Sequence, residues 1–141
     1  MEQNNLKERR HITPFKMNET ITKIKPAFSD DRGIISNIME QDVSHIAIIT
    51  SKKGSVRGNH YHPKQQQYCY LIFGKYESIT KDLKSGKEEK IIAVAGDLVH
   101  TPPMIAHAMV FLEDSSMLNI TTGQRDTDKF AEHTIKYQVT K

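Results

Sequence analysis

Short apolar segments that alternate with polar residues recur along the whole chain, and each is typical of a β-strand. The segment 45–50, His-Ile-Ala-Ile-Ile-Thr, is mainly apolar and β-branched and predicts a central strand. No longer segment repeats its apolar positions with a helical period, and only 126–132 is expected to form a helical turn. The other predicted strands are 21–25, 34–39, 57–62, 67–73, 76–81, 90–94, 98–100, 106–112, 117–121 and 134–139.

About ten short strands, separated by Gly, Asp or Pro residues, predict an all-β sandwich or barrel. The length of 141 residues suits one domain, and we place the barrel at 21–141. Residues 1–20 are polar and predict a solvated tail, or alternatively a strand that is lent to a partner subunit. Exposed strand edges invite pairing, so we expect a homodimer.

Composition and charge narrow the functional classes. No apolar run is long enough for a transmembrane helix, and the polar start of the chain lacks the apolar core of a secretory signal. Cys69 is the only cysteine, so an intrachain disulfide is excluded and a cytoplasmic location fits. The net charge of +3 is mild and dispersed, which argues against a nucleic-acid partner and suits an anionic small molecule.

The sequence Arg-Gly-Asn-His-Tyr-His at 57–62 is the main candidate for chemistry. His60 and His62 lie two residues apart, so on an extended strand both rings point to the same face. Arg57 precedes them, and its guanidinium suits a phosphate or a carboxylate. His107 follows a stiff Pro-Pro corner, and we expect the barrel to bring it into the same pocket. The alternative is a pair of surface histidines on an edge strand.

The spacing of these residues resembles the two motifs of the cupins, G-x5-H-x-H-x3,4-E-x6-G and G-x5-P-x-G-x2-H-x3-N. The first motif is matched by Gly54, His60, His62 and Gly74, with Gln67 at the glutamate position. The second is matched by Gly96, Pro102 and His107, with Met104 and Phe111 at its glycine and asparagine positions. The resemblance implies a single-domain cupin jelly-roll, or double-stranded β-helix. It does not identify the reaction, because cupins host many activities.

In metal-binding cupins the residues at these positions hold a divalent ion. The resemblance therefore implies a metal site made of His60, His62, Gln67 and His107. The amide oxygen of Gln67 is a neutral and weaker ligand than a carboxylate, but with three imidazoles it still suits Zn, Fe, Ni, Mn or Cu. A metal-dependent oxygenase or isomerase is accordingly one functional alternative.

The sequence at 57–62 also resembles the Arg-Gly-x-His-x-His stretch of cupins that act on nucleotide sugars, the dTDP-4-keto-6-deoxyhexose 3,4-ketoisomerases. The 3,5-epimerases of the rhamnose pathway share its first part. This likeness implies an isomerase or epimerase of surface-polysaccharide synthesis that requires no cofactor. His60 would be the leading base beside a ketone, with His62 as a second acid or base. Arg57 would bind the phosphates of the anionic sugar nucleotide.

Two tyrosines are candidate substrate-binding residues. Tyr68 and Tyr70 would stack on the sugar or the base, or supply a proton. If Gln67 faces the pocket, however, alternation turns both tyrosines outward, where they would serve the core or an interface. Cys69 is interpreted as a small buried hydrophobe, whereas His45 and His133 are interpreted as structural or surface residues. A non-catalytic cupin that binds a small ligand is the remaining alternative.

Overall fold

The structure is a computed structural model that describes residues 16–123 and 133–140. Within these residues the chain forms twelve strands and no long helix. The strands are β1 (Thr20–Lys23), β2 (Phe28–Asp30), β3 (Gly33–Ile35), β4 (His45–Ser51), β5 (Val56–Tyr61), β6 (Gln66–Phe73), β7 (Lys75–Asp82), β8 (Glu88–Val94), β9 (Asp97–Thr101), β10 (Ile105–Phe111), β11 (Ser115–Thr122) and β12 (Ile135–Lys136).

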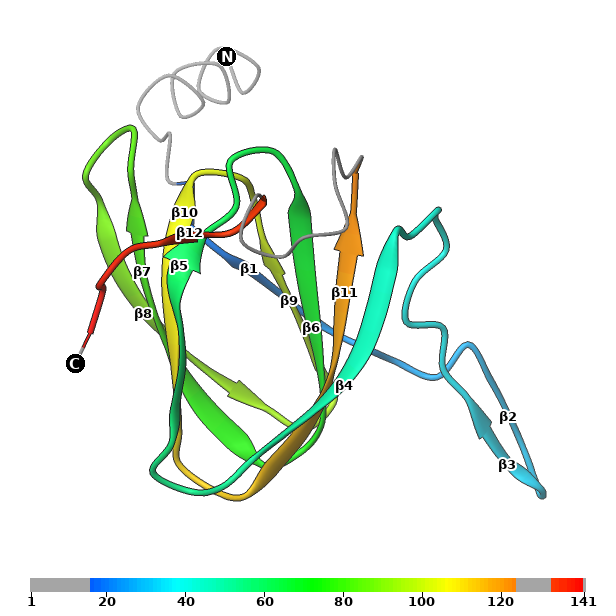
Figure 1. The fold of residues 1–141 in the computed structure, drawn as a ribbon. Coiled ribbons are helices and arrows are strands. Elements are labelled where there is room, and N and C mark those ends of the chain that lie inside the picture. Colours follow the sequence, from blue (N-terminus) through cyan, green and yellow to red (C-terminus); the bar gives the residue numbers. More distant parts are fainter. Residues whose placement is uncertain (1–15, 124–132, 141) are drawn as a thin grey trace, which may run out of the picture.

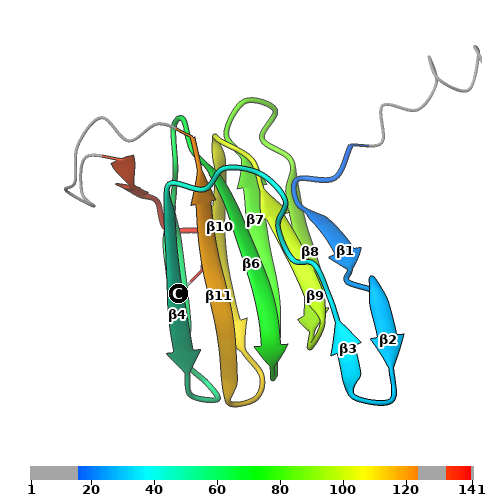
Figure 2. The same ribbon diagram turned by 90° about the vertical axis from the view of Figure 1, so that its right-hand side faces the viewer.

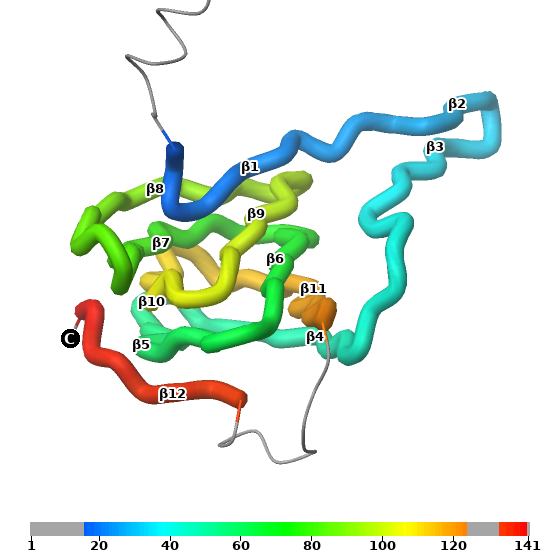
Figure 3. The backbone as a smooth tube through the Cα atoms, turned by 90° about the horizontal axis from the view of Figure 1, so that it is seen from above, coloured from blue at the N-terminus to red at the C-terminus, as the bar shows by residue number. Residues whose placement is uncertain are grey.

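Two five-stranded antiparallel sheets enclose the interior (Figure 1). One sheet has the order β1-β9-β6-β11-β4, and Figure 2 shows it from outside; the other has the order β12-β5-β10-β7-β8. Strands β2 and β3 form a separate two-stranded ribbon that extends away from the barrel (Figure 3). The arrangement is the predicted all-β jelly-roll.

Apolar side chains fill one half of the barrel. Their cluster comprises Cys69, Leu71, Tyr76, Ala93, Val99, Met109, Phe111 and Met117. Burying a large side chain of this kind stabilises the fold by about 1.5–3 kcal/mol. Towards the start of β6 the buried inward residues become polar and include Gln67, Thr80 and His107. The barrel is therefore a packed core at one end and a polar chamber at the other.

The predicted strand at 21–25 corresponds to β1 to within two residues at each end, and the central barrel strands were also predicted, but the predictions fail in part at the margins. From residue 45 to residue 121 the predicted strands match β4 to β11 to within two residues at each end. The prediction at 34–39 was wrong beyond Ile35, where β3 ends, and its partner β2 was not predicted. Strand β12 is shorter than the predicted 134–139. The predicted helical turn at 126–132 lies outside the described residues.

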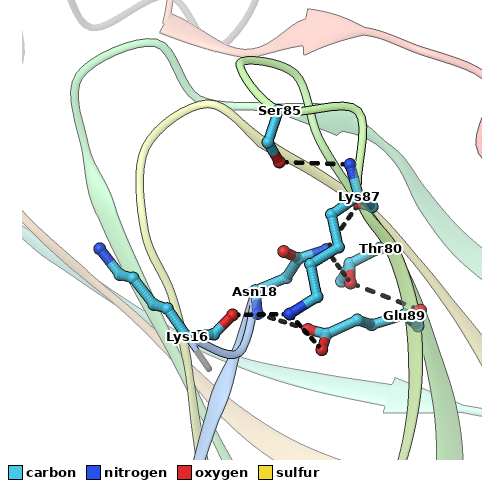
Figure 4. A network of polar contacts seen from close by, with 6 residues as sticks. All are labelled: Lys16, Asn18, Thr80, Ser85, Lys87 and Glu89. Atoms are coloured by element: carbon cyan, nitrogen blue, oxygen red, sulfur yellow. Dashed lines mark hydrogen bonds and ion pairs between the residues drawn. The ribbon is translucent and has the colours of Figure 1, made fainter. Parts of the chain in front are cut away.

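The described part of the predicted N-terminal tail packs against the barrel. Asn18 Nδ2 donates to Thr80 Oγ1 at 3.2 Å and to the backbone oxygen of Lys87 at 2.9 Å (Figure 4). Lys87 in turn forms an ion pair with Glu89 and donates to the backbone oxygen of Lys16. These contacts fix residues 16–18 on the β7–β8 hairpin, whereas residues 1–15 lie outside the described part.

Glu19 enters the interior and links the two sheets. Its carboxylate accepts hydrogen bonds from Ser78 on β7 at 2.6 Å and from Thr101 on β9 at 2.5 Å. Burial raises the pKa of this carboxyl above its ordinary value. The start of the described chain is thus part of the barrel wall.

The described residues include no helix that is long and apolar enough to span a membrane.

Candidate active site

An extra residue in β5 brings Arg57 and His60 to the same face of the sheet. Strand β10 pairs Met109 with Arg57 and His107 with His60, and the register shifts between these pairs. Residues 57 and 60 would point to opposite faces of a regular strand. The β-bulge, which leaves Asn59 without an opposite residue, shifts the alternation. As a result, Arg57 and His60 line one cavity.

The Gly-Asn pair explains why the bulge forms here. Gly58 has a φ of 92° and Asn59 a φ of 55°, in the left-handed region that Gly and Asn tolerate best. A Cβ atom on Gly58 would lie 2.8 Å from the backbone oxygen of His107, so the two strands approach closely. Asn59 Oδ1 accepts hydrogen bonds from the backbone N–H groups of Val139 and Thr140. The bulge therefore also holds the C-terminal segment.

Three imidazole rings converge at the end of β5. The ring centroids of His60 and His107 are 4.7 Å apart, those of His60 and His62 are 5.2 Å apart, and those of His62 and His107 are 6.3 Å apart. The predicted convergence of these residues is therefore observed, while the role of each ring stays a prediction.

Each ring has a different environment. His62 Nε2 lies 2.8 Å from Gln67 Oε1, and Nδ1 lies 3.1 Å from the backbone oxygen of His133, so the ring is held on both sides. His107 is buried, and its ring nitrogens have no hydrogen-bond partner among the described residues.

Burial, reinforced by His62, lowers the pKa of His60 to about 4. Burial also lowers the pKa of His107 well below its ordinary value. Both rings are therefore neutral near pH 7, and His60 is in the form that accepts a proton.

The rings of His60 and His62 border a cavity of about 240 Å³, whereas the buried ring of His107 does not line it. Pockets for drug-sized ligands have volumes of about 300–1,000 Å³, so this cavity can enclose only part of a nucleotide sugar. Its described lining contains no Asp or Glu, which favours an anionic ligand. Arg57 lines both this cavity and a more open groove of about 580 Å³ that includes Lys52 and Phe73. Arg57 therefore borders both an inner cavity and an outer groove, and the groove also contains the acidic Asp114.

Arg57 also joins β5 to β4. Its Nε donates to Ser51 Oγ at 2.8 Å, and its Nη2 donates to the backbone oxygen of Thr50 at 2.8 Å. These bonds fix the plane of the guanidinium, which can direct its other N–H groups to a ligand.

The implied metal ligands do not fit a metal ion in this arrangement. Within residues 16–123 and 133–140, no group of three or more His, Cys, Asp or Glu side chains could hold one. Gln67 Oε1 and His62 Nε2 are hydrogen-bonded to each other instead of facing a shared centre. Metal binding by His60, His62, Gln67 and His107 stays a prediction.

Tyr68 and Tyr70 lie on the outer face of β6 and do not line the cavity. Gln67 and Cys69 are buried on the inner face, so alternation turns the tyrosines outward. The ring of Tyr68 stacks on His100 with centroids 4.6 Å apart. The substrate-binding role of the two tyrosines stays a prediction, although the structure places them away from the imidazoles. Burial raises the pKa of the Cys69 thiol to about 12, which agrees with a small buried hydrophobe.

Five polar lining residues were not predicted, namely His45, Gln65, Asn119, Thr121 and His133. Gln65 shares the inward face of Gln67 by alternation, and Asn119 is a polar residue inside an apolar strand. The sequence therefore contained a signal for both residues. His45 and His133 were interpreted as structural or surface residues. His133 reaches the cavity from a distant segment for which the sequence offers no local signal.

Comparisons with known proteins identify the family and the fold of the chain. The model of the polysaccharide biosynthesis C-terminal domain matches residues 28–132. Among curated proteins, no sequence matches the chain significantly. Among solved structures, a 3,4-ketoisomerase from Thermoanaerobacterium thermosaccharolyticum in complex with TDP-4-keto-6-deoxyglucose has a TM-score of 0.69 and 20% identity, over 86% of this chain and 89% of that chain.

Two further structures resemble the fold. A TDP-quinovose 3,4-ketoisomerase from Campylobacter jejuni has a TM-score of 0.71 and 19% identity, over 86% of this chain and 94% of that chain. A dTDP-4-dehydrorhamnose 3,5-epimerase from Sulfolobus tokodaii has a TM-score of 0.67 and 24% identity, over 86% of this chain and 78% of that chain. The fold is thus cupin-like and close to that of sugar-nucleotide isomerases and epimerases. Because the domain model covers most of its length, the chain belongs to the polysaccharide biosynthesis C-terminal domain family.

Proposed function

We propose that the protein is a sugar-nucleotide ketoisomerase or epimerase of surface-polysaccharide synthesis, acting on a dTDP-4-keto-6-deoxyhexose-type substrate. The observation that carries the proposal is a cavity that is lined by Arg57, His60 and His62 and by no described acidic side chain. The buried ring of His107 lies beside it, with its centroid 4.7 Å from that of His60. Similarity of fold to a ketoisomerase that binds TDP-4-keto-6-deoxyglucose supports the same substrate class.

The inner cavity and the outer groove that Arg57 borders suit the two parts of such a substrate. The inner cavity of about 240 Å³ would hold the keto sugar beside the imidazoles. Arg57 would bind the diphosphate through its remaining N–H groups. The outer groove, with Lys52 and the exposed ring of Phe73, would accept the nucleoside.

Proton transfer alone completes the proposed ketoisomerisation. His60, as the leading base, would remove the proton from C3; the electron pair of the C–H bond forms a C3–C4 double bond, and the ketone oxygen takes the negative charge. His62, oriented by Gln67, is the second acid or base. Protonation at C4, with transfer of the C3 hydroxyl proton to the C4 oxygen, gives the 3-ketone. An anionic substrate raises the pKa of His60 and strengthens it as a base.

The test uses purified protein and dTDP-4-keto-6-deoxyglucose in deuterated water, followed by proton NMR. Deuterium entering C4 with a new 3-ketone indicates a ketoisomerase, whereas deuterium at C3 and C5 indicates an epimerase. Substitutions His60→Asn and His62→Asn, compared at matched TDP binding, identify the base by the larger loss of exchange. Absence of deuterium from C3, C4 and C5 would contradict the proposal. Thermal stabilisation by TDP without exchange would then favour a ligand-binding protein.

The metal-dependent alternative has its own test. Elemental analysis of purified protein would support it if a stoichiometric transition metal is found and is lost in a His107→Ala variant. The proposed proton transfers involve no net oxidation or reduction, so no cofactor is part of the leading proposal.

The predicted homodimer has a suitable surface on the sheet that contains β4 and β6. Ile46 and Ile48 of β4 and Ile72 of β6 are 56%, 69% and 44% exposed, and all point away from the barrel interior. Exposed apolar side chains on one sheet face commonly mark a protein contact. We therefore propose that a second copy of the chain covers this face.

A further inference from the structure

Three consecutive glutamines have three different surroundings. Gln66 Oε1 lies on the outer side of β6 and accepts a hydrogen bond from His100 Nε2 at 2.6 Å. Gln67 Oε1 lies inside and is hydrogen-bonded to His62 Nε2 at 2.8 Å. Gln65 is also inside, because residues 65 and 67 share one face, and it lines the cavity of the imidazoles.

Gln65 differs from its neighbours because its amide nitrogen is unused. The side chain is only 2% exposed, and Nε2 has no hydrogen-bond partner in the described part of the chain. A buried donor without an acceptor is costly, and native proteins retain few of them. The cavity beside it can hold part of a ligand. The unpaired N–H groups therefore require an acceptor that a ligand can supply.

The proposed reaction indicates which atom of the ligand would be this acceptor. Proton removal from C3 places a negative charge on the ketone oxygen, and this oxygen needs a donor that does not itself lose a proton. An amide N–H is such a donor, and the described lining has no carboxylate that would compete for it. A donor fixed in place before the reaction stabilises the developing charge at low reorganisation cost.

We propose that Gln65 Nε2 donates a hydrogen bond to the ketone oxygen of the substrate and stabilises the enediolate that forms there. This inference rests on the proposed function and adds a catalytic residue to it. Gln67, in contrast, orients His62, so the two inward glutamines have separate roles.

The experiment compares Gln65→Met with the matched control Gln66→Met, which removes an amide from the outer face. Gln65→Met is expected to lower the rate of deuterium exchange about 10²–10³-fold. Affinity for TDP, measured by calorimetry, should stay within about twofold, because TDP lacks the ketone. The melting temperature should stay equal or rise, because an unpaired buried donor is removed. Gln66→Met should retain wild-type exchange. A second variant, Gln65→Glu, whose carboxylate offers acceptors only, is expected to show the same loss of exchange.

Exchange by Gln65→Met within threefold of wild type would overturn the inference, as would a fall in its melting temperature, since that would identify a structural amide. If the wild-type protein itself shows no exchange, the proposed function fails, and binding then tests Gln65 separately. Wild type should in that case bind the keto sugar nucleotide more tightly than TDP, and Gln65→Met should lose this preference. An equal preference in both proteins, or no binding by wild type, would refute the role of Gln65.

Discussion

Replacing Gly58 by alanine tests the close contact between β5 and β10 on which the site depends. Two costs add at this position. A φ of 92° strains a residue with a Cβ by about 1–2 kcal/mol. The new Cβ would also lie 2.8 Å from the backbone oxygen of His107, which cannot rotate away as a side chain would. Relieving such an overlap costs about 1–3 kcal/mol, so Gly58→Ala should lose about 2–5 kcal/mol of unfolding free energy.

Gly86 provides a matched control. Its φ of 80° is similar, but a Cβ there would meet nothing within 4 Å. Gly86→Ala should therefore show the strain alone, about 1–2 kcal/mol. Urea unfolding of both variants isolates the contact with β10 as the difference between them. With a slope of about 2 kcal/mol per molar urea, the midpoint of Gly58→Ala should be lower by about 0.5–1.5 M. Equal midpoints for the two variants would refute the close approach of the strands.

Three further outcomes are expected. The unfolding free energy should fall as the pH is lowered from about 6.5 towards 4, because the unfolded His60 binds a proton at its ordinary pKa while the folded ring, with a pKa of about 4, stays neutral. His60→Asn should flatten this fall in urea titrations, and an unchanged slope would contradict the assignment. Ile48→Glu should convert a dimer to a monomer in sedimentation, because it places a charge on the exposed apolar face; an unaltered dimer would exclude this face as the interface. Asn59→Gly keeps the backbone conformation but removes the acceptor for Val139 and Thr140, so amide exchange there should become several-fold faster. Exchange as slow as in wild type would show that the segment is held by other contacts.

The barrel strands could be predicted because their residues alternate and are β-branched, and because turn residues separate them. At the margin β2 was missed and the predicted strands at 34–39 and 134–139 were too long, since β2, β3 and β12 lack a buried face: Phe28, Ile34 and Ile35 are all exposed. Such strands depend on contacts that no local pattern encodes. The segment after β12 is held by a side chain, because Asn59 Oδ1 accepts a hydrogen bond from the backbone N–H of Val139.

The residues of the functional site could also be predicted only in part. His60, His62 and His107 could be grouped because their spacing resembles that of the two cupin motifs. Simple alternation, however, places Arg57 and His60 on opposite faces, and only the bulge at Asn59 reverses this. Alternation did identify the outward position of Tyr68 and Tyr70 as one of two alternatives. Alternation could also place Gln65 on the inward face with Gln67, but it could not reveal the unpaired amide of that side chain, because an unsatisfied donor is a property of three-dimensional surroundings.

The additional residue in β5 has a consequence for how this kind of protein tolerates changes in length. A chain shortened by one position between Arg57 and His60 could keep every strand, every turn and the same core. The side chain of Arg57 or that of His60 would nevertheless move to the outer face of the sheet. Deletion of a single residue could therefore leave a well-folded barrel whose cavity lacks either the guanidinium or the first imidazole.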